Sequence, residues 1–455
     1  MRFNGWICSL IIALVATGAQ ATEKENCISR TEMQEISNHF TQFKNIAEKG
    51  DYCFDGSQTS HLLAGIMFMR KTQFASSMPN SPDELFSGRF ANNWYDYFIG
   101  RINQFEVQES CPKGVGAFVY FFGNTMFVCP MLLTENFTAL DRASVFMHEA
   151  RHIDGFPHMT CTNGPRQGLN GACDTRISDG GSYAVTVETY AQLAAYAGDL
   201  HPALRAYARS SAVLYADEAF ETPARVARTL QLLVMTKDQQ FHSIRVDGGG
   251  SDVKALGRSP SLGHIVMRGQ HMILYPDDKN LPAKYVFARS EGDIQQAAGD
   301  IAVEYNSQTP QQRSQLVDVH IAGQWSAKIF ADKTVMSCDP RSDARSEVAF
   351  KGETAAGMVY PNGYDRGSSK ASLIMTSGRV FEMGCENKVG YVRAANIEFD
   401  QKFKRIHKAG NEIIGLTEDG RLHRINGARS TPLVTAIDGQ IHEMAPNQQV
   451  DFFDK

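Results

Sequence analysis

The stretch His148-Glu149-Ala150-Arg151-His152-Ile153-Asp154-Gly155-Phe156-Pro157-His158 decides how the N-terminal half of this 455-residue chain is interpreted. Its first two histidines are four residues apart, so on a helix they lie on one face, one turn apart. Both imidazoles can then bind one zinc ion at about 2.0–2.1 Å. Glu149 follows the first histidine, where its carboxylate can accept a proton from a zinc-bound water. The stretch therefore predicts a zinc site carried by a helix.

The rest of the stretch suggests where a third zinc ligand comes from. Gly155 predicts the end of the helix, because glycine tolerates the left-handed conformation that turns the chain back. His158 follows three residues later and can supply the third protein ligand of a catalytic zinc site. The alternative is Glu188, on the alanine-lined face of a later helix, where Tyr183 and Tyr190 are candidates for stabilising an oxyanion. We expect one zinc per chain, with His158 preferred to Glu188 as the third ligand.

The pattern H-E-x-x-H-x-x-G-x-x-H resembles the motif of zincin metallopeptidases, and within them of the metzincins, over these eleven residues. No clear counterpart of the downstream methionine turn of metzincins follows it. The resemblance implies an α+β zincin-like catalytic domain and an exported zinc metallopeptidase that hydrolyses a protein or peptide substrate. It also implies that Glu149 acts as the general base. In zincins an edge strand before the active-site helix pairs with substrate, and a β-hairpin predicted at 117–122 and 125–129, around Gly123-Asn124, stands in that place.

Two other functions stay open on the same residues. One is a non-catalytic exported binding protein with a structural metal site, and the other is a zinc hydrolase that acts on a non-peptide amide bond. Glu149 argues against the purely structural site, because a closed metal site has no use for a neighbouring general base.

The N-terminus predicts export. Arg2 precedes an apolar run from Trp6 to Ala16, and Ala19-Gln20-Ala21 is a cleavage signal, so residues 1–21 are expected to be a signal peptide. The mature protein would then be secreted or periplasmic. No later stretch is apolar for about 18 residues, so no stable membrane insertion is expected after cleavage.

The cysteine count agrees with export. Of nine cysteines, Cys8 leaves with the signal peptide, and an even number in an exported chain indicates disulfides. Net charge is −5, which provides no electrostatic reason to expect nucleic acid as a partner. The eight remaining cysteines lie along the sequence as four successive neighbouring pairs. This order predicts the disulfides Cys27–Cys53, Cys111–Cys129, Cys161–Cys173 and Cys338–Cys385.

The C-terminal part has a different sequence pattern, with short predicted strands separated by tight turns. We place the zincin-like domain at 22–246, a glycine-rich linker at 247–252 and an all-β repeat domain at 253–455. Strand-turn-strand units recur there with turns at positions 292, 333, 378 and 420, a spacing that favours propeller-like blades over the alternative, a β-sandwich. We expect this domain to bind substrate or a partner.

Two further expectations concern single elements and residues. Helices are predicted over Pro202–Ala216 and Pro223–Met235, just before the linker. Several histidines of the repeat domain lack the spacing of metal ligands, and we interpret them as ordinary residues: His264, His271, His320, His407, His423 and His442.

Overall fold

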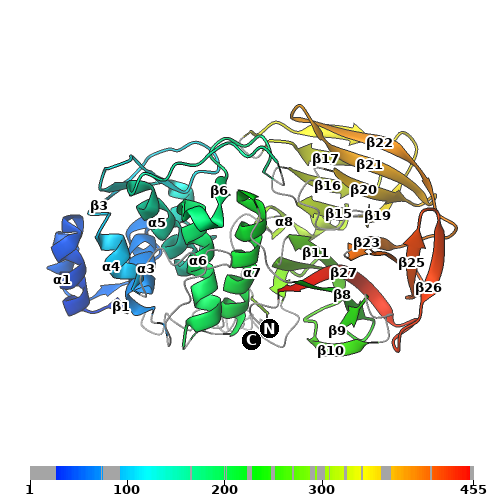
Figure 1. Ribbon diagram of the computed structural model, residues 1–455, viewed down its shortest axis with the longest axis horizontal. Helices are drawn as coiled ribbons and strands as arrows, with labels where there is room; N and C mark the ends of the chain where they lie inside the picture. The colour runs from blue at the N-terminus through cyan, green and yellow to red at the C-terminus, as the bar shows by residue number, and fades with distance from the viewer. Residues whose placement is uncertain are drawn as a thin grey trace, which may run out of the picture.

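The computed structural model shows a mainly helical N-terminal part followed by a part built from antiparallel sheets (Figure 1). The expected signal peptide lies outside the residues that it describes. These are residues 27–72, 74, 93–163, 166–198, 200, 202–222, 228–246, 252–268, 271–286, 293–294, 303–306, 308–321, 325–339, 342–359, 370–409 and 412–450.

The helical part packs its longer helices around one apolar core, in which the ring of Phe146 stacks on that of Phe98 with centroids 5.7 Å apart. Short strand pairs brace this core at its margins, namely β1 (Cys27–Ile28) with β2 (Tyr52–Cys53), and β6 (Asp174–Arg176) with β7 (Phe220–Thr222). The helices are α1 (Arg30–His39), α2 (Lys44–Ala47), α3 (Gln58–Lys71), α4 (Trp94–Ile99), α5 (Ala139–Ile153), α6 (Ser182–Tyr196) and α7 (Pro202–Glu218).

The predicted hairpin is present as β4 (Ala117–Val119) and β5 (Thr125–Val128), which pair antiparallel. β3 (Gln104–Val107) pairs parallel with the other side of β5, so β4 lies at the edge of this sheet. The tight turn is earlier than predicted. The amide of Gly123 donates to the carbonyl of Tyr120 at 2.9 Å, so the central residues are Phe121 and Phe122 instead of Gly123 and Asn124.

One buried carboxylate, that of Asp141, joins three helices. It completes a capping box at the start of α5, where Oδ2 accepts from the backbone and the hydroxyl of Thr138 at 3.0 and 2.8 Å. Its Oδ1 accepts the hydroxyls of Tyr190 on α6 and Tyr207 on α7, both at 2.9 Å. Because the cap and both cross-links share one side chain, the starting point of α5 is fixed relative to its two neighbours.

The C-terminal part consists of five four-stranded antiparallel sheets. Gly378 and Gly420 fall, as predicted, in turns between the second and third strands of two sheets. Lys333 is instead the first residue of β17, just after the corresponding turn of a third sheet, and the turn at 292 lies outside the described residues. The short helices α8 (Val303–Asn306) and α9 (Pro310–Ser314) interrupt the series. The strands are β8 (Arg228–Thr236), β9 (Gln240–Arg245) and β10 (Val253–Arg258); β11 (Gly263–Arg268), β12 (His271–Pro276), β13 (Lys284–Val286) and β14 (Asp293–Ile294); β15 (Leu316–Ile321), β16 (Ser326–Phe330), β17 (Lys333–Ser337) and β18 (Ser346–Ala349); β19 (Ala355–Val359), β20 (Lys370–Met375), β21 (Arg379–Glu386) and β22 (Val389–Glu398); β23 (Arg405–Ala409), β24 (Glu412–Leu416), β25 (Leu422–Asn426) and β26 (Arg429–Leu433); and β27 (Ile441–Val450).

These sheets form a closed β-propeller. The strands β27, β11, β15, β19 and β23 each contact the next in that order, and β23 contacts β27 again. The sheet that closes the ring takes three strands, β8 to β10, from its beginning and β27 from the C-terminal end of the described chain. This ring excludes the alternative of a two-layer β-sandwich.

The ring strands bring together charged residues that are far apart in the sequence; we call this set the axial network. His264 on β11 lies 2.8 Å from both Asp318 on β15 and Glu443 on β27. Arg405 on β23 also binds Glu443, at 3.2 Å. A Cβ on Gly357 of β19 would lie 2.2 Å from the Arg405 guanidinium, so this glycine makes room for it. His264 was interpreted as an ordinary residue because it lacks metal-ligand spacing; the fold gives it a role that this spacing does not report, among buried ionisable groups.

The boundary between the two parts also differs from the prediction. The segment expected to form a helix at Pro223–Met235 contains strand β8, and β8 pairs with β9 and β27 in the first propeller sheet. Strand β9 then pairs with β10, so the glycine-rich segment 247–252 connects two strands of one sheet and not two domains. Apart from Asp252, that segment lies outside the described residues.

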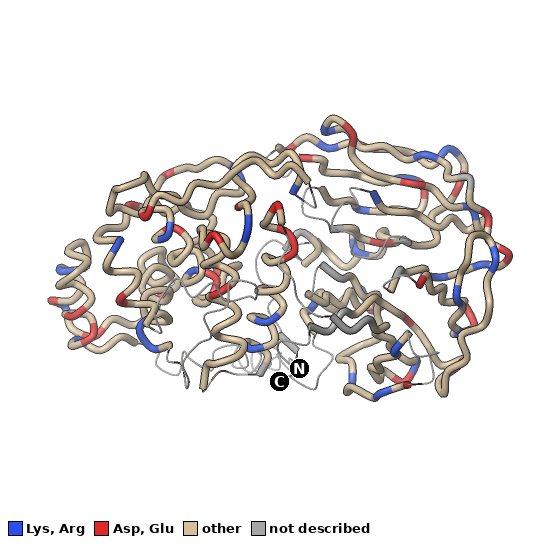
Figure 2. Tube along the Cα trace, in the orientation of Figure 1, with Lys and Arg blue, Asp and Glu red and all other residues tan. Residues whose placement is uncertain are grey.

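The two parts share a hydrophobic core. Helix α7 contacts β12, and the core of the helical part continues into residues of the second sheet, including Ile273, Tyr275 and Tyr285. Acidic and basic residues are mixed along the described trace of both parts (Figure 2). Because the shared core is apolar, the propeller and the helices are expected to behave as one folded body.

The eight cysteines form the four pairs expected from the sequence, and Cys338–Cys385 links the third and fourth propeller sheets. Four disulfides fit an exported protein, since such bonds persist in oxidising compartments. Among the residues described, no helix is both long enough and apolar enough to cross a membrane.

Candidate metal centre

Helix α5 positions the first two histidines of the candidate site. It is buried along most of its length, and His148 and His152 lie one turn apart near its C-terminal end. The helix ends at Ile153, and Gly155 follows with a φ of 85°, in the left-handed region that its lack of a Cβ allows. The predicted helix and its termination by Gly155 are both present.

The turn after α5 is held in place by two arginines. The Arg151 guanidinium binds the carboxylate of Asp154 at 2.8 Å and lies 3.8 Å from the centre of the Phe156 ring. Arg101 binds the same carboxylate from the neighbouring α4 segment at 3.0 Å. These contacts fix the backbone between Asp154 and Phe156, and so fix where His158 returns to the helix.

His158 returns to face both helix histidines. Its Nε2 lies 2.9 Å from Nε2 of His148 and 3.0 Å from Nε2 of His152. Metal-binding side chains are those of histidine, cysteine, aspartate and glutamate. Within the described part of the chain, the three histidines are the group of such side chains whose ligand atoms all lie within 4.8 Å of one another. Glu188 is buried on α6 but does not belong to this group. The geometry therefore favours His158 over Glu188 as a third ligand.

The other ring nitrogen of each histidine has a partner of its own. Nδ1 of His148 lies 2.8 Å from the hydroxyl of Thr186, which itself donates to the Ser182 carbonyl. Nδ1 of His152 lies 2.5 Å from the carbonyl of Phe156, and Nδ1 of His158 lies 2.8 Å from Oδ1 of Asp174. All three partners are therefore placed to accept a hydrogen bond, which puts the proton of each ring on Nδ1.

This proton assignment leaves three lone pairs facing one another. Burial lowers the pKa of His148 well below its ordinary value, with the neighbouring imidazoles adding to the decrease. Burial likewise lowers the pKa of His152 to about 4, with a smaller contribution from His158. A neutral ring whose proton is on Nδ1 presents an unprotonated Nε2, which is the form that binds a metal ion.

The separations fit a single tetrahedral ion. Zinc bound at about 2.0–2.1 Å would hold its ligand nitrogens roughly 3.3–3.4 Å apart, a few tenths of an ångström more than the distances seen here. Three imidazole nitrogens form a donor set that suits zinc. Magnesium and calcium select oxygen ligands instead, so this site favours zinc over both.

Asp174, which sequence reasoning missed, fixes the orientation of His158. Its Oδ1 accepts from His158, and its Oδ2 accepts the backbone amide of Tyr183 at the start of α6, at 2.8 Å. The strand pair β6–β7 holds its backbone, with Asp174 in register with Phe220. Gly181 is required beside it, because a Cβ there would lie 2.5 Å from Oδ2. A signal for Asp174 was its position immediately after Cys173, which closes the predicted Cys161–Cys173 disulfide loop just after His158.

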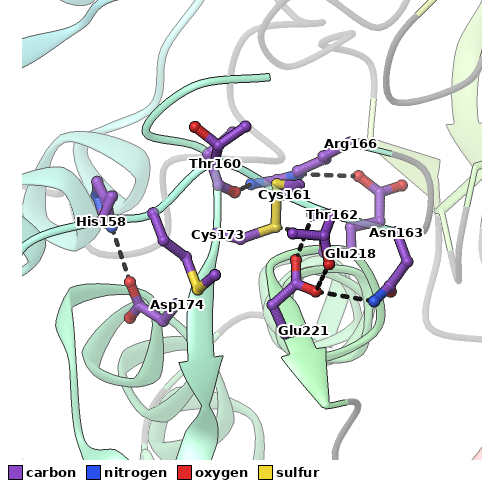
Figure 3. Close-up of a disulfide and its surroundings, with 12 residues drawn as sticks. His158, Thr160, Cys161, Thr162, Asn163, Arg166, Cys173, Asp174, Glu218 and Glu221 are labelled. Carbon is purple, nitrogen blue, oxygen red and sulfur yellow. Dashed lines mark hydrogen bonds and ion pairs between the residues drawn. A yellow bond between two sulfur atoms is a disulfide. The ribbon is translucent and has the colours of Figure 1, made fainter. Parts of the chain in front are cut away.

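The Cys161–Cys173 loop ties this region to the end of α7 (Figure 3). Glu221 on β7 accepts from the backbone of Thr162 at 2.7 Å and from the Asn163 side chain at 2.8 Å. Arg166 lies 3.5 Å from the carboxylate of Glu218. The Cys161 end of the loop is thus attached to α7 and β7, and the Asp174 side of the disulfide lies next to His158.

Glu149 and Tyr183 complete the surroundings. Burial raises the pKa of Glu149 well above the ordinary value of a glutamate. The Tyr183 ring stacks on His158, with centroids 4.4 Å apart, and meets His148 edge-on at 4.9 Å. Burial raises the pKa of Tyr183, Arg166 opposes that rise, and Asp174 and Glu149 add to it. Tyr190, the other candidate for stabilising an oxyanion, instead donates to Asp141.

Neither a protein-family model nor a curated protein matches this sequence. Among solved structures, the chain is similar to PorZ, a bacterial surface component of the type-IX secretion system of Porphyromonas gingivalis, at 11% identity over 44% of this chain and 27% of that one. It is also similar to Kluyveromyces lactis Hsv2 (12% identity, 44% and 62%) and to the Cps50 (Swd1) β-propeller domain of Myceliophteria thermophila (11% identity, 44% and 67%). Each TM-score is 0.22.

This chain spans less than two thirds of PorZ and of Hsv2. Scores this low carry no argument about function, and the propeller assignment rests on the strand pairing described above. None of these comparisons bears on the histidine cluster, which lies in the helical part.

Proposed function

We propose that the protein is an exported zinc-dependent metallopeptidase. The observation that supports this most directly is the convergence of three Nε2 atoms at 2.9 and 3.0 Å, with each Nδ1 next to a group placed to accept its proton. Without a cation, three lone pairs in one place repel one another. An arrangement that holds them there is therefore best explained as a preformed metal site.

The neighbouring residues supply the groups that hydrolysis needs. Bound zinc lowers the pKa of a coordinated water and polarises a carbonyl. The carboxylate of Glu149 would accept a proton from the water and pass it to the leaving amine. The positive charge of the ion would favour the ionised form of Glu149, against the effect of burial. The Tyr183 ring contacts His148, and Arg166 lies over that ring; we expect these two residues to stabilise negative charge on the substrate oxygen.

Metal content and peptide hydrolysis test the proposal together. The purified protein should contain one zinc per chain and should cleave a mixed peptide library. Glu149→Ala should keep the zinc but lose activity by about 10²–10⁴-fold, because only the base is removed. His158→Ala should lose zinc affinity by orders of magnitude. Glu48→Ala, which removes an exposed carboxylate at the C-terminal end of α2, is the matched control and should change neither property.

The alternatives are separated by the same samples. If the protein binds zinc and Glu149→Ala hydrolyses peptides at the parental rate, Glu149 is not the base. If neither protein cleaves peptides, a panel of non-peptide amides distinguishes another zinc hydrolase from a binding protein with a structural metal.

A further inference from the structure

Three consecutive aromatic residues at the turn of the β4–β5 hairpin are exposed; we call Tyr120, Phe121 and Phe122 the aromatic tip. Their exposed fractions are 67%, 49% and 85%. The other large apolar side chains that are exposed in the described part of the chain occur singly. Scattered exposed apolar residues are normal in folded proteins, whereas a contiguous cluster marks a surface that contacts something apolar.

The tip is held in place by the sheet beneath it. Phe118 on β4 stacks on Phe127 of β5 with ring centroids 5.0 Å apart, and the Tyr120 ring lies 5.4 Å from Phe127. These contacts fix the hairpin up to its turn. An apolar contact surface supported in this way loses little conformational freedom when a ligand binds.

Phe122 adopts a conformation that a phenylalanine rarely takes. Its φ is 61°, in the left-handed region, where a residue with a Cβ costs about 1 kcal/mol or more relative to glycine. Its side chain is almost fully exposed, so burial does not offset that cost. Glycine would suit this turn position better for stability, which suggests that the ring is retained for contact with a ligand.

The tip lies directly beside the candidate metal centre. The ring of Phe121 is 6.3 Å from that of His152, and a Cβ built on Gly155 would lie 3.8 Å from the Phe122 ring. Strand β4, from which the tip continues, also contacts the metal-binding helix α5. A peptide whose scissile bond reached the three histidines would therefore place a nearby side chain against these rings.

From these observations we infer that the aromatic tip binds a large apolar side chain of the substrate, close to the bond that is cleaved. This inference rests on the proposed peptidase function, because it assigns the tip to the substrate of that site. It makes the substrate class a peptide with phenylalanine, leucine or a similar residue near the scissile bond. A lipid surface is the other apolar partner to consider, but continuity of the tip with the metal centre favours the peptide.

The test uses two quenched fluorescent peptides of equal length and charge, with Phe-Leu or Ser-Ser at the centre. Binding is measured by fluorescence on the zinc-loaded Glu149→Ala protein, so that cleavage does not interfere. The Phe-Leu peptide should bind about tenfold more tightly than the Ser-Ser peptide, as expected for one well-packed apolar side chain. The double substitution Phe121→Ser/Phe122→Ser, introduced into the Glu149→Ala protein, should abolish this preference. Added Val434→Ser, which removes an exposed apolar side chain from the propeller, should preserve it.

Phe122→Gly separates ligand contact from a structural role. Glycine accepts the positive φ, so this variant should unfold at the same temperature as the parent or higher. It should nevertheless lose most of the preference for the Phe-Leu peptide. A lower unfolding temperature together with unchanged binding would mean that the ring stabilises the hairpin, and the inference would be wrong.

The remaining outcomes distinguish failure of this inference from failure of the proposed function. If the parental enzyme cleaves both peptides equally and the tip variants do not alter this, the function stands and the inference falls. If nothing is cleaved but the tip-dependent preference appears, the tip is an apolar peptide-binding surface, and the peptidase proposal falls together with the assignment of the tip to a cleavage site. Equal or absent binding of the two peptides overturns the inference. The inference is also overturned if the tip variants lose binding to phosphatidylcholine–phosphatidylglycerol vesicles but keep parental binding to the peptides.

Discussion

Gly181 is the position at which a single methyl group would disturb the metal centre. Its φ of −72° is available to any residue, so alanine would not strain the backbone. A Cβ there would, however, lie 2.5 Å from Oδ2 and 3.0 Å from Cγ of Asp174. The carboxylate would have to move, although it holds both His158 and the first turn of α6.

We therefore expect Gly181→Ala to weaken zinc binding by about 10–100-fold, the range typical of losing a residue that orients a ligand. Competition with a chelator measures the affinity, and circular dichroism checks that the fold is retained. Gly198→Ala is the control, since a Cβ at that position meets nothing within 4 Å. Parental zinc affinity in Gly181→Ala would show that Asp174 does not orient His158.

The residues of this site divide into those that sequence could predict and those that it could not. His148, Glu149, His152, Gly155 and His158 lie within eleven residues, so helical periodicity and a glycine turn suffice to bring the histidines together. Asp174 is brought to the histidines by the pairing of β6 with β7, and β7 lies more than 40 residues after Asp174 in the sequence. Thr186 is brought to them by the packing of α6 on α5. The position of Asp174 after Cys173 was a hint of its place, but no local pattern reports the contacts of Asp174 and Thr186, and so their roles appear only in the fold.

The start of helix α5 depends on one buried side chain. Asp141 accepts hydrogen bonds from Thr138, Tyr190 and Tyr207, and replacing it with alanine would leave two buried phenols without their acceptor. We expect Asp141→Ala to lower the free energy of unfolding by about 3 kcal/mol or more, from the lost cap and the unpaired hydroxyls. Urea denaturation provides the measurement. Thr138→Ser keeps the capping hydroxyl and should cost little; an equal loss in both variants would contradict this account.

Strand β8 shows why one element was predicted wrongly. Its residues Leu232, Leu233, Val234 and Met235 are all buried, with alternate side chains in two different hydrophobic clusters. A strand covered on both faces has no alternation of apolar and polar residues, so its sequence looks like a buried helix. The later strands were easier to predict because tight turns recur between them. The closing strand pair was hidden from this approach, since nothing local links β27 to β8.

At the scale of the whole molecule, the axial network should make stability depend on pH. Burial alone lowers the pKa of His264, but the charges of Asp318 and Glu443 outweigh burial and the repulsion from Arg405, so the pKa is raised. Burial opposes the decrease in the pKa of Asp318 and Glu443, but the cationic partners, Arg405 and His264, hold both below their ordinary values. His264 therefore stabilises the fold below its unfolded pKa, about 6.5, and loses this effect as pH rises through the folded value. The carboxylates contribute above about pH 4 and lose their effect as pH falls.

The comparison of parent and His264→Gln should show this window. The difference in urea midpoint should be largest between about pH 5 and 6.5 and should shrink toward pH 9, as His264 loses its proton. Burial lowers the pKa of His320 to about 3 and that of His407 to about 4, so both histidines titrate below this window. The range from about pH 5.5 to 9 spans the titration of His264. A difference in urea midpoint that stays constant over this range would show that the charge of His264 contributes nothing to stability.

The pairing of β27 with β8 has a consequence for how the chain acquires its structure during synthesis and export. Ile441 is in register with Thr236, about 200 residues earlier, so this contact has a very long sequence separation. The first propeller sheet emerges as three strands with an unpaired ring-side edge, and it must wait for almost all of the remaining chain. Chain entropy makes such closure slow, and an open strand edge is prone to mispairing with other chains. Maturation of the protein is thus expected to be limited by the arrival of β27, and that is the stage at which a chaperone would have most to protect.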